Sequence, residues 1–132
     1  MRSWKIASLA LLVAAGLTTP TAAETAKNVA LILDASGSMN GKLLSGEKKI
    51  TAAKTAVRDL VAKIPGTINL SFRAYGHQSH RSKKNCRDTQ LLVPFGAATD
   101  VSDKIVAQSS ALRAQGYTPI TYVLGLAADD LK

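Results

Sequence analysis

Apolar residues recur along the chain with two different periods, and this pattern predicts alternating strands and helices. A short continuous apolar run over 28–33 ends in Asp34, which is typical of a strand buried on both faces of a mainly parallel sheet. Over 47–64 the apolar residues recur every three or four positions, which predicts a helix with one stripe against the sheet. This stripe consists of Ile50, Ala53, Val57, Leu60, Val61 and Ile64, and Pro65-Gly66 ends it.

Two further strands are predicted in the middle of the chain. In 68–75, Ile68, Leu70 and Phe72 alternate with polar residues, which indicates a second strand. The stretch 89–93, which stops before Pro94, predicts a third strand. A long polar and basic turn connects the two.

Two helices are predicted in the last third of the chain. Asp100 can cap a helix that runs to about Arg113. Its less regular apolar positions are Val101, Ile105, Val106 and Leu112. Thr118 as N-cap and Pro119 at the first helical position predict the last helix. Its apolar stripe comprises Ile120, Val123, Leu124, Ala127, Ala128 and Leu131, and the resulting order β-α-β-β-α-α indicates an α/β fold.

The first 23 residues have the three regions of a secretory signal peptide. Arg2 and Lys5 supply a positive start, 6–17 is an apolar stretch, and small residues lead to a cleavage site before Glu24. The apolar stretch has 12 residues, fewer than the roughly 18 that cross a bilayer, so we expect no membrane span in the mature chain. The signal predicts that residues 24–132 are exported to the periplasm or the exterior.

Composition places the exported part among globular, basic proteins. The whole chain has 132 residues, 46% of them hydrophobic, which fits one folded domain. Its net charge of +8 falls to +6 when Arg2 and Lys5 are removed with the signal. The single cysteine, Cys86, excludes a disulfide-stapled miniprotein. Because an unpaired thiol is a liability in an oxidising compartment, we expect a partner cysteine beyond Lys132 in the parent protein.

The loop after the first predicted strand carries the clearest chemical signal. In Asp34-Ala-Ser-Gly-Ser-Met, the side-chain oxygens of Asp34, Ser36 and Ser38 recur at every second residue and can face one ion. Oxygen ligands without Cys or His favour a hard cation, Mg²⁺ before Ca²⁺ or Mn²⁺. The alternative is a serine-rich turn that Asp34 merely caps.

In its setting this motif resembles the metal-ion-dependent adhesion site of von Willebrand factor type A domains. The family pattern is a hydrophobic strand, Asp-x-Ser-x-Ser, a helix, and a threonine on a later loop. Asp34, Ser36 and Ser38 match the motif, and Thr118 in Gly-Tyr-Thr-Pro-Ile is similar to the later threonine. The resemblance covers residues 27–132.

The resemblance implies a fold, a cofactor and a partner. The fold is a doubly wound, mostly parallel sheet with helices on both faces. The cofactor is a single Mg²⁺ ion, with Mn²⁺ or Ca²⁺ as alternatives, and a partner protein supplies a carboxylate to it. The family has a further metal-site aspartate after the next strand, so we expect 24–132 to be the N-terminal part of such a domain, incomplete at its C-terminus.

The segment 73–87 is the second candidate functional region. Its partner-binding candidates are Arg73, His77, Arg81, Lys83, Lys84 and Arg87, which can steer an acidic partner towards the metal. A solvated connection between two strands is the simpler explanation of the same residues. A zinc site from His77, His80 and Cys86 lacks a fourth ligand and a recognised spacing.

These observations favour an exported, metal-dependent protein-binding module of the adhesion type. The protein is not expected to be an enzyme, because neither a Gly-x-Ser-x-Gly elbow with a placed histidine nor a phosphate-binding P-loop is present. We expect no nucleic-acid partner. The alternative function is a structural or anionic-polymer-binding protein of the cell envelope that uses the basic segment 73–87.

Overall fold

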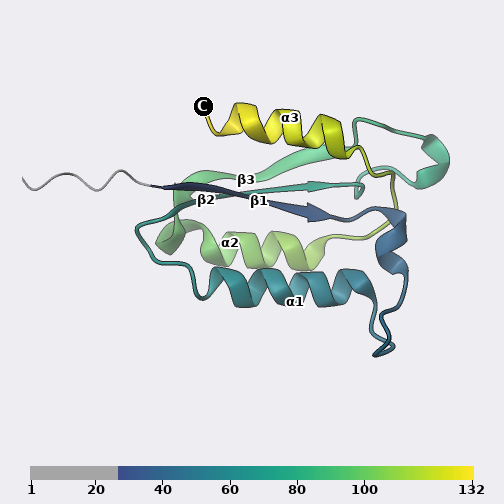
Figure 1. Ribbon diagram of the computed structural model, residues 1–132, viewed down its shortest axis with the longest axis horizontal. Coiled ribbons are helices and arrows are strands. Elements are labelled where there is room, and N and C mark those ends of the chain that lie inside the picture. Colours follow the sequence, from purple (N-terminus) through teal and green to yellow (C-terminus); the bar gives the residue numbers. More distant parts are fainter. Residues whose placement is uncertain (1–26) are drawn as a thin grey trace, which may run out of the picture.

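Residues 27–132, the part that the computed structural model describes, form a three-stranded sheet between helices (Figure 1). The predicted signal peptide, residues 1–23, lies outside this part. The elements are β1 (Asn28–Asp34), η1 (Gly37–Asn40), α1 (Lys49–Val61), β2 (Asn69–Tyr75), η2 (Arg81–Lys83), β3 (Thr89–Ala97), α2 (Ala98–Ala111) and α3 (Ile120–Asp130). Their order confirms the predicted β-α-β-β-α-α succession. Within this part, no helix combines the length and apolar character that crossing a bilayer requires.

The sheet has the order β1-β2-β3 and is mixed. β1 and β2 are parallel and in register from Asn28 opposite Asn69 to Asp34 opposite Tyr75, whereas β3 is antiparallel to β2. The α/β class is therefore confirmed. The third strand continues through Pro94 to Ala97, so the prediction that it stops before the proline is wrong. Pro94 is exposed on a strand at the edge of the described sheet, where the register with β2 is irregular, and proline is tolerated at such edges and bulges.

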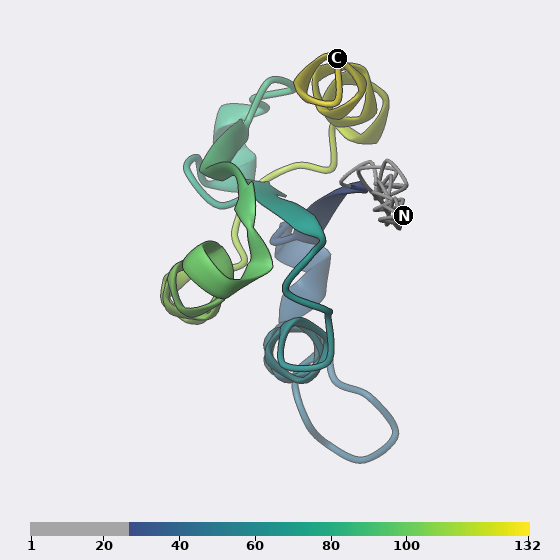
Figure 2. The ribbon, with the colours of Figure 1, turned by 90° about the vertical axis from the view of Figure 1, so that its left-hand side faces the viewer.

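Helices cover both faces of the sheet (Figures 1 and 2). α1 and α2 pack side by side on one face, and α3 lies on the other. β2 is buried almost throughout because it lies between the other two strands and between the helical layers. The largest buried side chains include Phe72, Leu70, Ile105 and Val123. This arrangement explains why β2 does not follow the simple alternation that the sequence suggested.

Two predicted apolar stripes were wider than the buried faces. Leu60 on α1 is 47% exposed, although it falls in the periodic pattern. On α3 only Val123 and Ala127 are buried, whereas Ile120 and Leu124 are more than half exposed. α3 therefore contacts the sheet along a narrow strip.

The starts of α2 and α3 also differ from the prediction. α2 begins at Ala98, two residues before Asp100, and α3 begins at Ile120 with Pro119 at the N-cap position. Neither helix has a side-chain cap hydrogen bond, so Asp100 and Thr118 do not cap them as predicted. The backbone at Ala97 turns directly from β3 into α2, which leaves no loop for a separate cap.

Polar groups between α1 and α2 are satisfied within the layer. Lys54 on α1 donates from Nζ to the carbonyls of Ser110 (2.8 Å) and Leu112 (2.7 Å), at the end of α2 where carbonyls lack helical partners. Burial lowers the pKa of Lys54.

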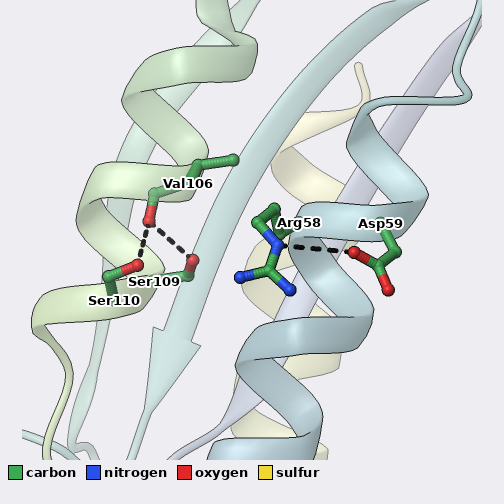
Figure 3. A network of polar contacts seen from close by, with 5 residues as sticks. All are labelled: Arg58, Asp59, Val106, Ser109 and Ser110. Carbon is green, nitrogen blue, oxygen red and sulfur yellow. Dashed lines mark hydrogen bonds and ion pairs between the residues drawn. The ribbon is translucent and has the colours of Figure 1, made fainter.

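The hydroxyls of Ser109 and Ser110 both donate to the Val106 carbonyl, as Figure 3 shows. Figure 3 also shows the exposed ion pair of Arg58 with its neighbour Asp59 on α1, across from these serines.

An ion pair fixes α3 to the sheet. Arg73, in the middle of β2, is only 7% exposed, and both its Nη2 and Nε donate to Asp130 Oδ2, at 2.6 and 3.0 Å. The pair is mostly buried, with side-chain exposures of 8% for Arg73 and 18% for Asp130. Arg73 is thus engaged inside the fold, and its assignment to a partner-binding surface is corrected.

The loops that follow β1 and β2 meet the loop before α3 with almost no space between their backbones. Gly76 has φ +72, and a Cβ atom there would lie 2.7 Å from both Ser36 Cα and Tyr117 O. The Gly76 carbonyl accepts a hydrogen bond from Gly116 N at 2.8 Å, and its N–H donates to Asp88 O at 2.9 Å. This contact, which we call the loop junction (Ser36, Gly76, Asp88, Gly116 and Tyr117), holds three loops at one end of the sheet.

Removing the carboxylate of Asp130 should destabilise the fold far more than removing that of its neighbour. Asp130→Ala leaves Arg73 buried without a counter-ion, which costs roughly 3 kcal/mol of unfolding free energy. Asp129→Ala removes only an exposed pair with Lys132, worth about 0.5 kcal/mol or less. Urea denaturation of both variants measures the difference, and equal midpoints would show that the buried pair does not fix α3.

Gly76→Ala should destabilise the protein more than Gly46→Ala. Both glycines have positive φ, +72 and +85, so both alanines strain the backbone by about 1 kcal/mol. Only at Gly76 does the added methyl meet other backbone atoms, and the total cost should rise to roughly 2–4 kcal/mol. Denaturant titration of the two variants compares these costs, and a Gly76 variant no less stable than the Gly46 variant would mean that the junction yields easily.

Candidate metal site

The predicted metal ligands Asp34, Ser36 and Ser38 lie together at the end of β1. The backbone N–H of Ser36 donates to Asp34 Oδ1 at 2.7 Å, which fixes the carboxylate against the loop. The hydroxyl oxygens of Ser36 and Ser38 are 3.0 Å apart and share a hydrogen bond. Ser36 is 1% exposed, Asp34 is partly buried and Ser38 is exposed, so the three groups run from the interior to the surface.

Thr118 lies on the loop that runs beside this motif. Ser36 and Gly116 form a parallel β-bridge, and Gly37 N donates to Gly116 O at 2.8 Å. Thr118 follows two residues later and is exposed. No hydrogen bond joins its hydroxyl to Asp34, Ser36 or Ser38, all of which the structure describes. The fold therefore brings the threonine's segment next to the motif without a hydrogen bond from its side chain to the three residues.

The charge of Asp34 acts on the phenol of Tyr75. Tyr75 is the register partner of Asp34 on β2 and is only 6% exposed. Burial, followed by the negative charge of Asp34, raises the pKa of Tyr75 to about 12. The phenol thus stays neutral at physiological pH beside the carboxylate of the motif.

The alternative zinc site is not formed. Within residues 27–132, no three His, Cys, Asp or Glu side chains gather closely enough to hold a metal ion. His80 Nδ1 is 2.9 Å from the hydroxyl of Ser82, and His77 Nε2 lies 3.4 Å from Gln90. Cys86 is exposed and free among the described residues.

Asp88 organises the site region, although no motif in the sequence marks it. It is completely buried, and its carboxylate accepts hydrogen bonds from the backbone N–H groups of Gln78 (3.1 and 3.2 Å) and Ser79 (2.8 Å). A Cβ atom at Gly116 would lie 2.7 Å from Asp88 Oδ2. The signal in the sequence was a lone acidic residue at the end of a basic segment, directly before a predicted strand.

The basic segment is firmly attached beside the metal loop. Arg81 N donates to Gln115 O at 2.8 Å, and Gln115 Nε2 donates to His77 O at 2.6 Å. Gly37 lies inside the motif, and a Cβ atom at this position would be 3.7 Å from the Cδ atom of Arg81. The start of η1 and the segment around η2 thus come together from distant parts of the sequence.

The predicted partner-binding residues differ in exposure. Arg81, Lys83, Lys84 and Arg87 are exposed, and none of them is in an ion pair within residues 27–132. The guanidinium of Arg87 lies 5.9 Å from the centre of the Tyr122 ring on α3. His77 is partly buried, and its Nδ1 is buried without a hydrogen-bond partner. Four of the six candidates therefore form an exposed cationic rim (Arg81, Lys83, Lys84 and Arg87).

Comparison with known proteins shows similarity to proteins whose names state no function. No family model matches the chain. The chain is 32% identical over 101 residues to the uncharacterized protein YwmD of Bacillus subtilis, a match that covers 74% of this chain and 44% of that protein. A crystal structure of an uncharacterized protein from Alicyclobacillus acidocaldarius is similar with a TM-score of 0.58 and 30% identity, over 82% of this chain and 41% of the other.

The fold also occurs in a protein from Vibrio fischeri that is described as an uncharacterized membrane spanning protein. The TM-score is 0.53 and the identity 21%, over 79% of this chain and 50% of that one. At this identity the similarity concerns the fold alone. The chain thus spans half or less of the length of each of these relatives.

Proposed function

We propose that the protein is an exported binding module that holds a Mg²⁺ ion with Asp34, Ser36, Ser38 and Thr118 and captures a carboxylate of a partner protein through that ion. The observation that carries the proposal is the cluster of Asp34, Ser36 and Ser38 oxygens at the end of β1. The carboxyl ends of parallel strands are where open α/β sheets bind ligands.

The spacing of the two hydroxyls suits a small cation. Adjacent ligands of an octahedral Mg²⁺ ion, each about 2.1 Å from the metal, are about 3.0 Å apart, whereas Ca²⁺ ligands at about 2.4 Å are about 3.4 Å apart. Ser36 Oγ and Ser38 Oγ are 3.0 Å apart. A mutual hydrogen bond has the same length, so the hydroxyls can exchange it for a shared ion without moving apart. We therefore prefer Mg²⁺, with Mn²⁺ or Ca²⁺ as alternatives.

The charge of this ligand set explains why a partner would be needed. Two or three neutral hydroxyls and one carboxylate neutralise only half of a divalent charge, so the bound ion remains attractive to an outside carboxylate. Mg²⁺ keeps several water molecules in sites with few protein ligands, and a carboxylate can replace one of them. The metal would then form part of the interface.

Binding, rather than catalysis, is the activity that this arrangement supports best. The imidazoles of His77 and His80 contact Gln90 and Ser82, and no hydrogen bond joins either of them to Ser36 or Ser38. A serine nucleophile would lack its base. We accordingly infer a binding protein and not an enzyme, acting in the periplasm or outside the cell if the predicted signal peptide is used.

The fold proposed from the resemblance is a doubly wound sheet of the von Willebrand factor type A kind. Its support is the parallel pair β1 and β2, the helices on both faces, and the position of Asp34 at the end of β1. β3 is antiparallel to β2, and an antiparallel strand at the edge is also found in otherwise parallel sheets of other proteins.

The cationic rim (Arg81, Lys83, Lys84 and Arg87) suits a partner with further acidic groups around the captured carboxylate. Because Arg81 lies against Gly37, a partner that reaches the metal loop also approaches this rim. The second candidate function, binding of an anionic envelope polymer, uses the same cations and does not need the metal. The unpaired charges of the rim are the observation that favours it.

Divalent metal binding should depend on the oxygens of the β1 loop. Asp34→Asn should weaken the affinity by roughly tenfold or more, since even the loss of an outer partner of a metal site costs that much. Ser38→Ala should weaken it while leaving the fold intact, because Ser38 is exposed. Titration of the exported form with Mn²⁺ by electron paramagnetic resonance, and with Mg²⁺ by calorimetry, measures both effects.

Asp103→Asn is the matched control, because Asp103 is exposed on α2, far along the chain from the motif. It should leave the affinity unchanged. Equal metal affinity of the wild type, Asp34→Asn and Ser38→Ala would contradict the assignment.

An acidic peptide should bind in a metal-dependent way. A fluorescent Glu-rich peptide should bind the Mg²⁺-loaded protein and be released by EDTA, and the double variant Lys83→Gln, Lys84→Gln should bind it a few-fold more weakly at low salt. A glutamine version of the peptide is the control. Binding that resists EDTA but disappears when the salt concentration is raised would instead favour the anionic-polymer function.

A further inference from the structure

The hairpin between η1 and α1 presents two exposed leucines, Leu43 and Leu44. Leu44 is fully exposed and Leu43 is 41% exposed, which is unusual for large apolar side chains close together. The hairpin projects away from the sheet and helices beside the start of α1, in both views of the ribbon (Figures 1 and 2). Burial in a core therefore does not account for these leucines.

The hairpin has a defined conformation. Lys42 and Lys48 form an antiparallel bridge, Leu43 N donates to Glu47 O at 2.8 Å, and Gly46 N donates to Leu43 O at 2.9 Å. At its base, Gly41 N donates to Ser38 O at 3.0 Å and Lys49 N donates to Gly41 O at 2.9 Å. The leucines are thus held at the tip of a short, hydrogen-bonded hairpin.

Charges are arranged in a layer behind the apolar tip. Residues 43–46 carry no charged side chain. Behind them, Lys42, Lys48 and Lys49 are exposed, and the single carboxylate is that of Glu47, which pairs with Leu43 across the hairpin. From the tip inwards, a surface approaching the hairpin meets first two leucines and then a net positive charge.

We propose that this hairpin tip (Leu43 and Leu44, with Lys42, Lys48 and Lys49 behind it) inserts into the surface of an anionic lipid bilayer. The layers match those of a membrane, in which hydrocarbon lies beneath a plane of phosphate groups. The leucines enter the acyl region, and the lysine ammonium groups remain at the phosphates. A convex apolar tip also suits a deformable surface that needs no preformed pocket.

This contact is separate from the proposed metal function. The two regions share Ser38, whose hydroxyl belongs to the proposed metal site. Only its backbone carbonyl contacts the hairpin, by accepting the hydrogen bond from Gly41 N. The hairpin itself contains none of the proposed metal ligands. Membrane binding should therefore persist in EDTA, whereas partner capture should not.

The test is vesicle flotation of the exported form, with phosphatidylcholine vesicles that contain phosphatidylglycerol or lack it. The wild type should float with the anionic vesicles and much less with the neutral ones, in EDTA as in Mg²⁺. The double variant Leu43→Ser, Leu44→Ser should bind them at least about tenfold more weakly, since each leucine buried in hydrocarbon is worth about that factor. Leu60→Ser, at a 47% exposed leucine on α1, is the matched control and should float like the wild type.

A second readout reports insertion directly. Leu44→Trp should show a blue shift of its fluorescence when anionic vesicles are added, and Leu60→Trp should not. A wild type that does not float at low salt would overturn the proposal. The leucines would then be expected to bind a pocket on a partner protein. Flotation that survives the double leucine substitution but is lost in Lys83→Gln, Lys84→Gln would also overturn it, because the rim would then be the membrane-binding surface.

Discussion

The organisation of this protein depends on the close contact of three backbone segments at one end of the sheet. Gly76 and Gly116 are the residues that allow it, because a Cβ atom at either position would lie 2.7 Å from atoms of the neighbouring loops. The fully buried Asp88 completes the contact by accepting backbone hydrogen bonds from Gln78 and Ser79. This contact consequently holds three segments together: the β1 loop, the basic segment and the loop before α3.

This constraint connects the packing of the fold with its proposed chemistry. Asp34 and Ser36 are positioned by β1 and by the bridge to Gly116, so the fold itself holds the oxygens of the proposed metal site together. Preorganisation of this kind lowers the cost of binding, since few side chains must be ordered afterwards. On the face of the sheet opposite α1 and α2, the buried pair of Arg73 and Asp130 fixes α3. The loop before α3 carries Thr118. Stability and site geometry therefore depend on the same segments.

The sequence was sufficient to predict the elements that local periodicity defines. Apolar spacing, together with helix-ending and helix-starting residues, was enough to predict β1, α1 and β2 and the order of all six elements. It also placed Asp34 at the end of β1. The gathering of Asp34, Ser36 and Ser38 was also predictable, because the three residues are neighbours in one loop.

What the sequence could not reveal depends on contacts between distant residues. The role of Arg73 requires a partner 57 residues away on α3, so the residue was assigned to the surface with its basic neighbours. Asp88 and Gly76 act on loops that only the folded chain brings together. Leu60 and the exposed side of α3 satisfy the helical period but face away from the sheet, since periodicity does not fix the width of the buried strip.

We propose that the β1 loop, held in place by this contact, binds a divalent cation. The most direct measurement is an anomalous difference map from crystals of the exported form grown with Mn²⁺. We expect one strong peak at about 2.0–2.3 Å from the side-chain oxygens of Ser36 and Ser38, close to Asp34 and Thr118. A map in which Mn²⁺ occupies only other carboxylates, such as those of Asp100 and Asp103 on α2, would contradict it.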